Sequence, residues 1–257
     1  MTPLIDLTNR VALVTGGSRG IGAATVRLLA AAGADVVFTY HTRREEADRV
    51  AQGVEALGRR VRAVQADLAQ REACERSVRE AAEGFGRLDF FIANAGIWPV
   101  EEVSVARMPD DRWRHTLAVN LDSVFYGTRA ALDVMQAGGR VIIVSSTAGQ
   151  RGEAFHADYA ATKGAIISFV KSVCVEAAPR GITVNSVAPG WVDTEMSAVP
   201  YEADGGAGRK RIEATIPVGR VATAEEIAGP IVFLCSALAA SINGEILNVN
   251  GGSVLCG

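Results

Sequence analysis

The sequence predicts an α/β protein: one domain with an open, doubly wound parallel sheet of about seven strands and helices on both faces. Short, continuous apolar runs alternate with longer amphipathic stretches, and strands of that kind are buried on both sides. Because crossovers between parallel strands are right-handed, the helices cover both faces of the sheet. The 257 residues contain no low-complexity linker and no internal repeat, so we expect a single domain over residues 1–257.

The predicted strands and helices alternate along the chain. We expect strands at 10–16, 35–40, 60–67, 88–96, 140–146, 181–190 and 245–252. The amphipathic stretches between them predict helices at 21–34, 43–58, 70–85, 110–136, 158–178 and 223–236. The stretch 191–222 breaks this pattern. Its length, prolines and glycines are typical of a loop that closes over a site.

Composition and charge narrow the class of function. The net charge of −3 does not support nucleic-acid binding. No apolar run reaches about 18 residues, and the N-terminus lacks the pattern of a signal peptide, so we expect a cytoplasmic protein without membrane contact. The cysteines, Cys74, Cys174, Cys235 and Cys256, have no metal-binding spacing, and we expect reduced thiols and no metal site. Only Cys256 is a candidate reactive thiol.

Polar and small residues gather at the carboxyl ends of the predicted strands, where ligands bind in open α/β sheets. These ends carry Gly16, Tyr40, Asp67, Asn94, Ser146 and Pro189. Asp67, which precedes Leu68, has two interpretations: it bonds an adenine amino group, or it caps the following helix. The pattern therefore predicts a ligand site at this edge of the sheet.

The segment TGGSRGIG (residues 15–22) joins the first predicted strand to the first helix. Gly16, Gly20 and Gly22 allow a tight turn and the close approach of a pyrophosphate, which a helix N-terminus favours. A tight turn without a ligand is the alternative interpretation. The position on the first strand–helix unit of a parallel sheet favours a dinucleotide.

The end of the second predicted strand indicates which dinucleotide binds. NAD sites carry an acid about 20 residues after the glycine loop, and residues 39–42 contain none. Arg19 lies in the glycine loop and Arg43 follows the strand, and arginine binds phosphate bidentately. We therefore favour NADP(H), with NAD(H) as the alternative. The other interpretation of Arg43 is an ion pair on the helix surface.

Three residues have a spacing that suits carbonyl chemistry. Tyr159 and Lys163 share one face of a predicted helix, and Ser146 ends a predicted strand. A phenol has a pKa near 10, and a nearby ammonium lowers it. The serine hydroxyl can orient a carbonyl oxygen while the phenol donates a proton to it. Tyr159 and Lys163 alone would also suit an ordinary surface pair.

With these motifs in order, the chain resembles the short-chain dehydrogenase/reductase family over essentially its whole length. The matching elements are the glycine loop TGGSRGIG, Asp67–Leu68, ANAG (93–96), Asn120, Ser146, YAATK (159–163) and PGWVDT (189–194). The resemblance implies a Rossmann-type sheet, a nicotinamide cofactor and a homotetramer. The small residues within 160–170 agree with a helix at a subunit interface; burial against the protein's own sheet is the alternative.

The resemblance also implies roles for individual residues. Tyr159 is implied to be the general acid and base, Lys163 to lower its pKa and bind the nicotinamide ribose, and Ser146 to hold the substrate oxygen. Asn120 is implied to order a water that links Lys163 to solvent. The implied cofactor site comprises Gly16, Ser18, Arg19, Gly20, Ile21, Gly22, Tyr40, His41, Asp67, Leu68, Asn94, Ala95, Gly96, Tyr159, Lys163, Pro189, Gly190, Val192 and Thr194.

The substrate is indicated less sharply. The chain is similar to β-ketoacyl carrier-protein reductases, but it departs from them at IWPVEEV (97–103) and lacks a basic cluster after Met135. Arg129 and Arg180 are then the candidates for docking an acyl carrier protein. We expect a pocket wall that includes Trp98, Gln150, Glu153, Phe155, His156, Trp191, Met196 and Tyr201. Such a wall suits a medium-sized, partly apolar ketone or secondary alcohol, cyclic or aromatic.

The sequence therefore predicts an NADP(H)-dependent oxidoreductase that reduces a ketone or 3-oxo group to a secondary alcohol, or catalyses the reverse. Reduction of a 3-oxoacyl carrier-protein substrate is one alternative. A non-catalytic dinucleotide-binding redox sensor is another, but a sensor does not need Ser146, Tyr159 and Lys163. An epimerase or dehydratase on the same fold is a third, and it would usually carry a longer C-terminal region.

Overall fold

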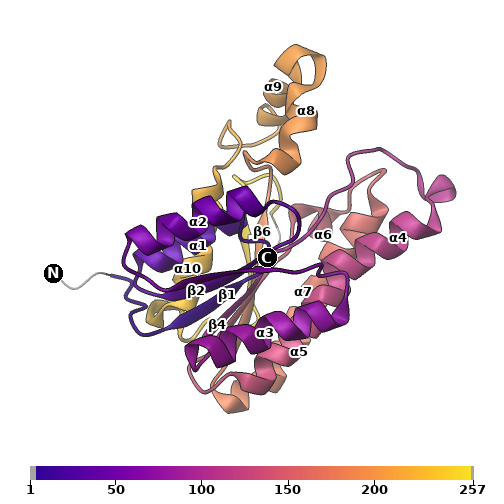
Figure 1. Ribbon diagram of the computed structural model, residues 1–257. Helices are drawn as coiled ribbons and strands as arrows, with labels where there is room; N and C mark the ends of the chain where they lie inside the picture. The colour runs from indigo at the N-terminus through magenta and orange to yellow at the C-terminus, as the bar shows by residue number, and fades with distance from the viewer. Residues whose placement is uncertain (1–3, 256–257) are drawn as a thin grey trace.

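Seven parallel strands form one sheet in the computed structural model, which describes residues 4–255 (Figure 1). Their order across the sheet is β3-β2-β1-β4-β5-β6-β7. The strands are β1 (Val11–Val14), β2 (Asp35–Tyr40), β3 (Val61–Gln65), β4 (Phe90–Ala93), β5 (Arg140–Val144), β6 (Thr183–Pro189) and β7 (Ile246–Val249). The strand order reverses between β1 and β4, and such a reversal opens a crevice at the carboxyl ends of the strands. The predicted doubly wound, Rossmann-type sheet is confirmed.

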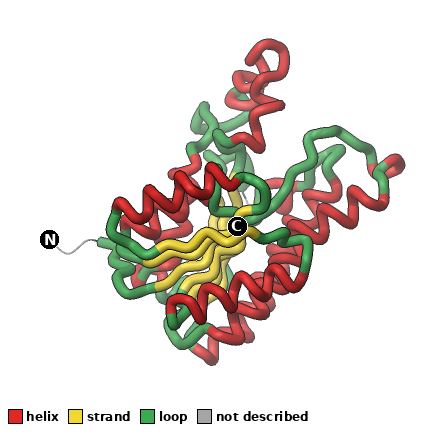
Figure 2. Tube along the Cα trace, viewed as in Figure 1, coloured by secondary structure: helices red, strands yellow, loops and turns green. Residues whose placement is uncertain are grey.

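Helices cover both faces of the sheet (Figures 1 and 2). One face is covered by α1 (Gly20–Ala31), α2 (Arg44–Ala56) and α10 (Ala224–Cys235). The other is covered by α3 (Arg71–Phe85), α5 (Ser123–Val134) and α7 (Ala157–Ala177). Along β1, Ala12 and Val14 belong to the first core and Leu13 to the second. This burial on both faces explains why the strands read as continuous apolar runs.

The predicted helix 110–136 is wrong as a single element. The structure has α4 (Asp110–Leu117), a π-helical turn (Ala118–Asp122) and then α5. The turn contains Asn120, whose side chain is buried and bonds the backbone of Ile97. An inserted residue of this kind is common at functional sites, and hydrophobic periodicity does not reveal it.

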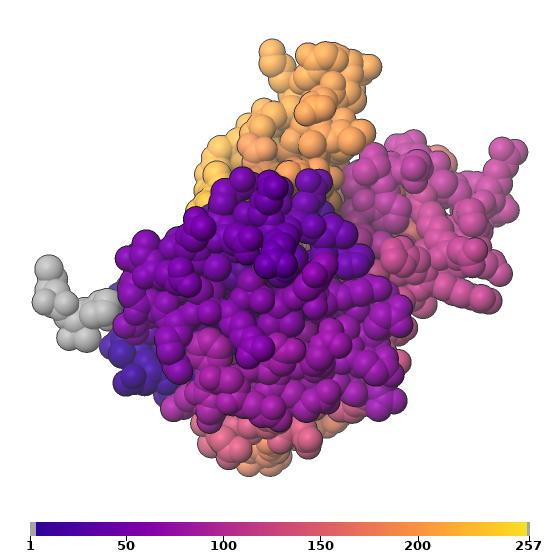
Figure 3. Space-filling model, in the orientation of Figure 1, coloured from indigo at the N-terminus to yellow at the C-terminus, as the bar shows by residue number. Residues whose placement is uncertain are grey.

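The stretch 191–222 is not wholly a loop. It contains α8 (Ala198–Glu202) and α9 (Ala207–Glu213), which project beyond the carboxyl edge of the sheet (Figures 1 and 3). Tyr201, Ile216 and Val221 bury a small separate apolar cluster beneath these helices. The short α6 (Thr147–Arg151) follows β5 and was also not predicted. Helices of one or two turns are too short to show a period.

The structure was searched for reactive cysteines, metal-binding clusters and membrane-spanning helices. Cys74, Cys174 and Cys235 are buried and free, whereas Cys256 lies outside the described residues. Within residues 4–255, no group of His, Cys, Asp and Glu side chains could hold a metal ion. The same part of the chain has no helix with the length and apolar character that crossing a membrane requires.

Candidate active site

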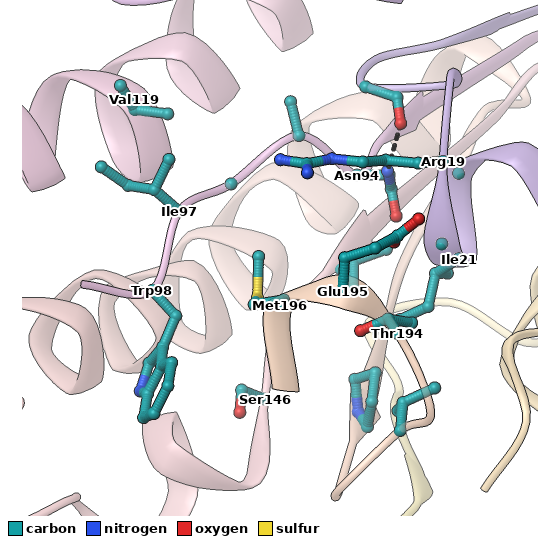
Figure 4. Close-up of a pocket in the computed structure, with 18 of the residues that line it drawn as sticks. Arg19, Ile21, Asn94, Ile97, Trp98, Val119, Ser146, Thr194, Glu195 and Met196 are labelled. Atoms are coloured by element: carbon teal, nitrogen blue, oxygen red, sulfur yellow. Dashed lines mark hydrogen bonds between the residues drawn. The ribbon is translucent and has the colours of Figure 1, made fainter. Parts of the chain in front are cut away.

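A cavity of about 400 Å³ lies at the carboxyl edge of the sheet. One part, the glycine-loop half, is lined by residues 16–22, the ends of β2 and β3, and residues 94–96. The other part, the tryptophan half, is lined by Trp98, Glu153, Trp191 and Met196. Figure 4 shows Arg19 extended over the cavity, with Trp98 and Ser146 at the opposite end.

The structure brings almost all the predicted site residues together. Lining the cavity are Gly16, Ser18, Arg19, Gly20, Ile21, Gly22, Tyr40, His41, Asp67, Leu68, Asn94, Ala95, Gly96, Trp98, Ser146, Tyr159, Lys163, Pro189, Gly190, Trp191, Val192 and Thr194. Among the predicted catalytic and cofactor residues, Asn120 alone does not line it.

The glycine loop has the shape of a phosphate cradle. Gly16 has a φ of +68°, a conformation that favours glycine, and a Cβ on Gly22 would lie 2.1 Å from the Gly16 carbonyl oxygen. The N-cap of α1 is Arg19, whose side chain does not cap the helix. The backbone N–H groups of the first helical turn therefore remain available to an anion, so these residues fit a dinucleotide pyrophosphate.

Asn94 and Thr15 fix the glycine loop to β4. The Asn94 side-chain amide donates to the carbonyl oxygens of Thr15 at 3.0 Å and Gly16 at 3.3 Å. In return, the Thr15 hydroxyl oxygen accepts from the backbone N–H groups of Asn94 and Ala95, each at 3.0 Å. The structure thus shows Asn94 as a support of the glycine loop: its side chain bonds the loop backbone, and the residue also lines the cavity.

The charged side chains around the glycine-loop half favour a phosphate in addition to the pyrophosphate. Within residues 4–255, the Arg19 side chain makes no ion pair, whereas Arg43 lies 3.7 Å from Glu46. The acid of β2, Asp35, is at the opposite edge of the sheet and pairs with Arg60 at 2.7 Å. A guanidinium without an ion pair suits a 2′-phosphate.

Asp67 lines the cavity but does not cap α3. The N-cap of α3 is Gln70, and Asp67 Oδ1 instead accepts from the Ala69 backbone N–H at 3.1 Å. The prediction of Asp67 as a helix cap is therefore wrong, because a short turn separates it from the helix. The alternative, a contact with adenine, stays a prediction.

Ser146, Tyr159 and Lys163 meet where the two halves join. Ser146 and Tyr159 both line the cavity, and the Ser146 hydroxyl oxygen accepts from the Ala148 backbone N–H at 3.1 Å as the N-cap of α6. Lys163 Nζ donates to the Val144 carbonyl oxygen at 2.8 Å and lies 5.7 Å from the centre of the Tyr159 ring. The predicted cluster is thus assembled from β5, α6 and α7.

Burial dominates the pKa values of this cluster. It raises the pKa of Tyr159 to about 12, although the hydrogen bond from Ser146 opposes the shift. It lowers the pKa of Lys163 to about 8. The lowering of the Tyr159 pKa by Lys163 stays a prediction; in this arrangement the Lys163 ammonium donates to the Val144 carbonyl oxygen.

Asn120 supports the site from behind. Its Oδ1 accepts from the Ile97 backbone N–H at 2.8 Å, and its Nδ2 donates to the Ile97 carbonyl oxygen at 2.9 Å. A Cβ on Gly96 would lie 3.3 Å from Asn120 Oδ1 and 3.5 Å from Lys163 Nζ. Asn120 therefore fixes the start of the 97–103 segment next to Lys163. Its role in ordering a water stays a prediction.

Only half of the predicted pocket wall faces the cavity. Trp98, Glu153, Trp191 and Met196 line it, whereas the other four predicted residues do not. Gln150 bonds Asn248, and the Tyr201 hydroxyl donates to the Val192 carbonyl oxygen at 2.9 Å. Phe155 is 51% exposed, and His156 is buried against Trp98. Those four assignments are wrong because these side chains turn toward other partners or toward solvent.

The prediction also missed several lining residues. These are Ile97, His115, Val119, Thr147, Arg151 and Glu195, among others. His115 and Val119 are four residues apart in the helical run that carries Asn120, and this spacing was a usable signal. Arg151 and Glu195 belong to short elements, α6 and a 3₁₀ turn, for which the sequence offers no comparable pattern.

Comparisons with known proteins agree with this geometry. The model of a family described as "Enoyl-(Acyl carrier protein) reductase" matches residues 16–253. The 3-oxoacyl-(acyl-carrier-protein) reductase of Synechocystis sp. is 39% identical over 252 residues, which cover 97% of this chain and 98% of that protein. The corresponding reductase of Escherichia coli K12 is 40% identical over 250 residues, which cover 96% of this chain and 98% of the relative.

Solved structures are similar to this fold over nearly all its length. A short-chain dehydrogenase from Burkholderia cenocepacia, in complex with NADP, has a TM-score of 0.90 and 38% identity, covering 96% of this chain and 98% of its own. A blue fluorescent protein from a metagenomic library, in complex with NADPH, has a TM-score of 0.91 and 35% identity, with 97% and 100% covered.

Proposed function

We infer the function from one premise: the chain belongs to the short-chain dehydrogenase/reductase family. It is an NADP(H)-dependent oxidoreductase that reduces a ketone or 3-oxo group to a secondary alcohol, or catalyses the reverse. The observation that carries this function is that Ser146, Tyr159 and Lys163 line one cavity together, at the junction of the glycine-loop half and the tryptophan half. A substrate carbonyl at this junction would contact the proton donor Tyr159 and lie next to the glycine loop that binds the dinucleotide.

Three side chains of the junction carry the proton chemistry. Ser146 donates a hydrogen bond to the substrate oxygen and orients it, and Tyr159 gives that oxygen its proton. When bound, NADPH supplies the hydride. Lys163, whose pKa of about 8 leaves it mostly charged at pH 7, offers positive charge close to the phenol. Asn120 holds the backbone beside Lys163, where we place the water that returns the proton.

The glycine-loop half binds the cofactor. The first turn of α1 receives the pyrophosphate, and Arg19 receives the 2′-phosphate, because its guanidinium has no ion pair within residues 4–255. Asn94, Ala95 and Gly96 lie beside the adenosine ribose. Thr194 and the backbone at Val192 lie beside the carboxamide. Structures similar to this chain that contain NADP and NADPH support the choice of cofactor.

Reduction of a 3-oxoacyl carrier-protein substrate is the second candidate, and the names of the relatives favour it. The two arginines proposed for docking an acidic carrier are already engaged, however. Arg129 pairs with Glu75 at 2.7 Å, and Arg180 donates to the carbonyl oxygens of Leu132 and Met135 at 2.6 and 2.8 Å. These contacts favour a free ketone over a carrier-bound one.

We also propose that the protein is a cytoplasmic homotetramer that assembles through α5 and α7. Phe125 on α5 and Val175 on α7 are exposed apolar side chains, which suits a subunit interface. Some small residues of α7 are explained by packing within the chain and not by contact with another subunit. Gly164 packs against Gly149 of α6, where a Cβ would lie 3.2 Å from the Gly149 carbonyl oxygen.

The experiment that tests this function measures oxidation of NADPH and NADH against a panel of ketones. The panel contains acetoacetyl thioesters, quinones, and cyclic and aromatic ketones. We expect NADPH-dependent reduction of at least one cyclic ketone. Strong reduction confined to the thioesters would favour the carrier-protein substrate, and no oxidation with any member would contradict the proposed function.

A further inference from the structure

The tryptophan half has a wall built from aromatic rings. The ring of Trp98 stacks on that of His156, with centres 4.6 Å apart and an angle of 19° between the planes. Trp191 meets Trp98 nearly at a right angle, with centres 6.3 Å apart and planes at 80°. His156 is buried and supports Trp98 from behind, while both tryptophans line the cavity (Figure 4 for Trp98). Two rings at this angle form a corner for a flat group.

Contacts between distant segments hold this corner in place. The Val103 backbone N–H donates to the Phe155 carbonyl oxygen at 3.1 Å, which joins the segment after Trp98 to the segment before α7. Arg112 donates to the Glu101 carbonyl oxygen at 2.7 Å and pairs with the buried Asp158 at 3.0 Å. The corner is therefore already formed before a substrate binds, which reduces the entropy that binding must remove.

A carboxylate stands within this apolar corner. Glu153 Oε1 accepts from Trp98 Nε1 at 3.2 Å and lies 3.8 Å from His156 Nδ1. The second oxygen, Oε2, makes no hydrogen bond within residues 4–255. The side chain is 21% exposed and lines the cavity. Tyr159 lines the same cavity, and after burial, which is the main cause, the charge of Glu153 adds to the raised pKa of Tyr159.

Glu153 Oε2, a hydrogen-bond acceptor without a donor in the tryptophan half, indicates which chemical groups the substrate carries. A flexible acyl chain packed against Glu153 would leave the second carboxylate oxygen, Oε2, desolvated and without a donor, which is unfavourable. An anionic group would meet repulsion. A flat ring with a hydroxyl group fills the tryptophan corner and gives Glu153 a hydrogen bond, which is stronger when the acceptor is charged.

We propose that Trp98, Trp191 and Glu153 form a subsite for a planar cyclic ketone that carries a hydroxyl group, with the hydroxyl donating to Glu153. This inference rests on the proposed function, because the ketone must reach Tyr159 at the same time. Glu153 is then a residue that determines specificity, and the hydrogen bond from Trp98 holds it in position.

The test uses matched ring ketones at pH 8 with NADPH. The substrates are 1-tetralone and its 5-, 6- and 7-hydroxy and methoxy derivatives, so that each hydroxyl is compared with a group of similar size that cannot donate. We expect at least one hydroxyl isomer to exceed its methoxy partner by roughly tenfold or more in kcat/KM. In Glu153→Gln that ratio should fall by roughly tenfold, because the acceptor is no longer charged.

A control variant separates this effect from a general change of charge. Glu102→Gln removes a carboxylate from the same segment as Trp98, but Glu102 is exposed and does not line the cavity. Its hydroxyl-to-methoxy ratios should equal those of the wild type. Equal ratios in wild type and Glu153→Gln, with turnover retained, would overturn the subsite alone. The absence of any NADPH-dependent turnover would overturn the proposed function and the subsite with it.

Discussion

The two halves of the cavity are held in place in different ways. The glycine-loop half depends on backbone geometry: the positive φ of Gly16, the first turn of α1, and the hydrogen bonds between Thr15 and Asn94. The tryptophan half depends on contacts between side chains, such as the stacking of Trp98 on His156 and its hydrogen bond to Glu153. The comparison teaches that one cavity can be held by two kinds of contact: bonds to backbone groups in one half and contacts between side chains in the other.

The first prediction separates chemistry from binding at the junction of the halves. Tyr159→Phe removes the proton donor, so kcat with the best ketone should fall by roughly 10²–10⁴-fold. The affinity for NADPH, measured by fluorescence titration, should stay nearly unchanged. Tyr126→Phe is the matched control, since Tyr126 lies on α5 outside the cavity. Equal loss of turnover and of NADPH binding would show that Tyr159 only supports the cofactor site.

The second prediction concerns the cost of burying Lys163. Its folded pKa of about 8 lies below the ordinary 10.5, so the cost is full below pH 8, decreases as the pH rises toward 10.5, and is absent above it. The full cost is roughly 3 kcal/mol. In urea unfolding, Lys163→Met should therefore gain stability relative to wild type at pH 7 and lose most of that gain at pH 10. A difference independent of pH would contradict the buried ammonium.

The third prediction tests the glycine-loop half alone. Arg19→Ala should weaken NADPH binding by roughly 10–100-fold, as expected for a charge-assisted hydrogen bond, and leave NADH binding nearly unchanged. Arg44→Ala is the control, because Arg44 is exposed and lies 3.8 Å from Asp48 rather than in the cavity. If Arg19→Ala leaves the preference for NADPH over NADH intact, the 2′-phosphate is held elsewhere, with Arg43 as the next candidate.

The fourth and smallest effect tests the tryptophan half. Trp98→Ala removes the ring stacked on His156 and the donor to Glu153. We expect kcat/KM for cyclic ketones to fall by roughly tenfold, while small acyclic ketones and the KM for NADPH change little. Initial rates over the ketone panel measure this. A substrate profile identical to that of the wild type would place Trp98 in a purely structural role.

The same contrast between the two halves explains which parts of the fold and of the site could be predicted from the sequence. The sheet, the glycine loop and the Ser146–Tyr159–Lys163 cluster could be predicted from local sequence patterns. The carboxyl ends of parallel strands lie at one edge of the sheet, so the residues that follow them form one site. Phe155 could not be placed, because its φ of +64° turns the chain and leaves its side chain exposed. The π-helical turn at Asn120 was also missed, because its effect is a shift in register and not a change in hydrophobicity.

The central claim is that the two halves meet so that a ketone held at Ser146 and Tyr159 receives hydride from the cofactor. The most direct measurement incubates the protein with a cyclic ketone and NADPH deuterated at both C4 positions, and analyses the alcohol by mass spectrometry and NMR. The account predicts one deuterium on the carbinol carbon with the wild type and almost no product with Tyr159→Phe. An alcohol without deuterium, formed while NADPH is consumed, would contradict it.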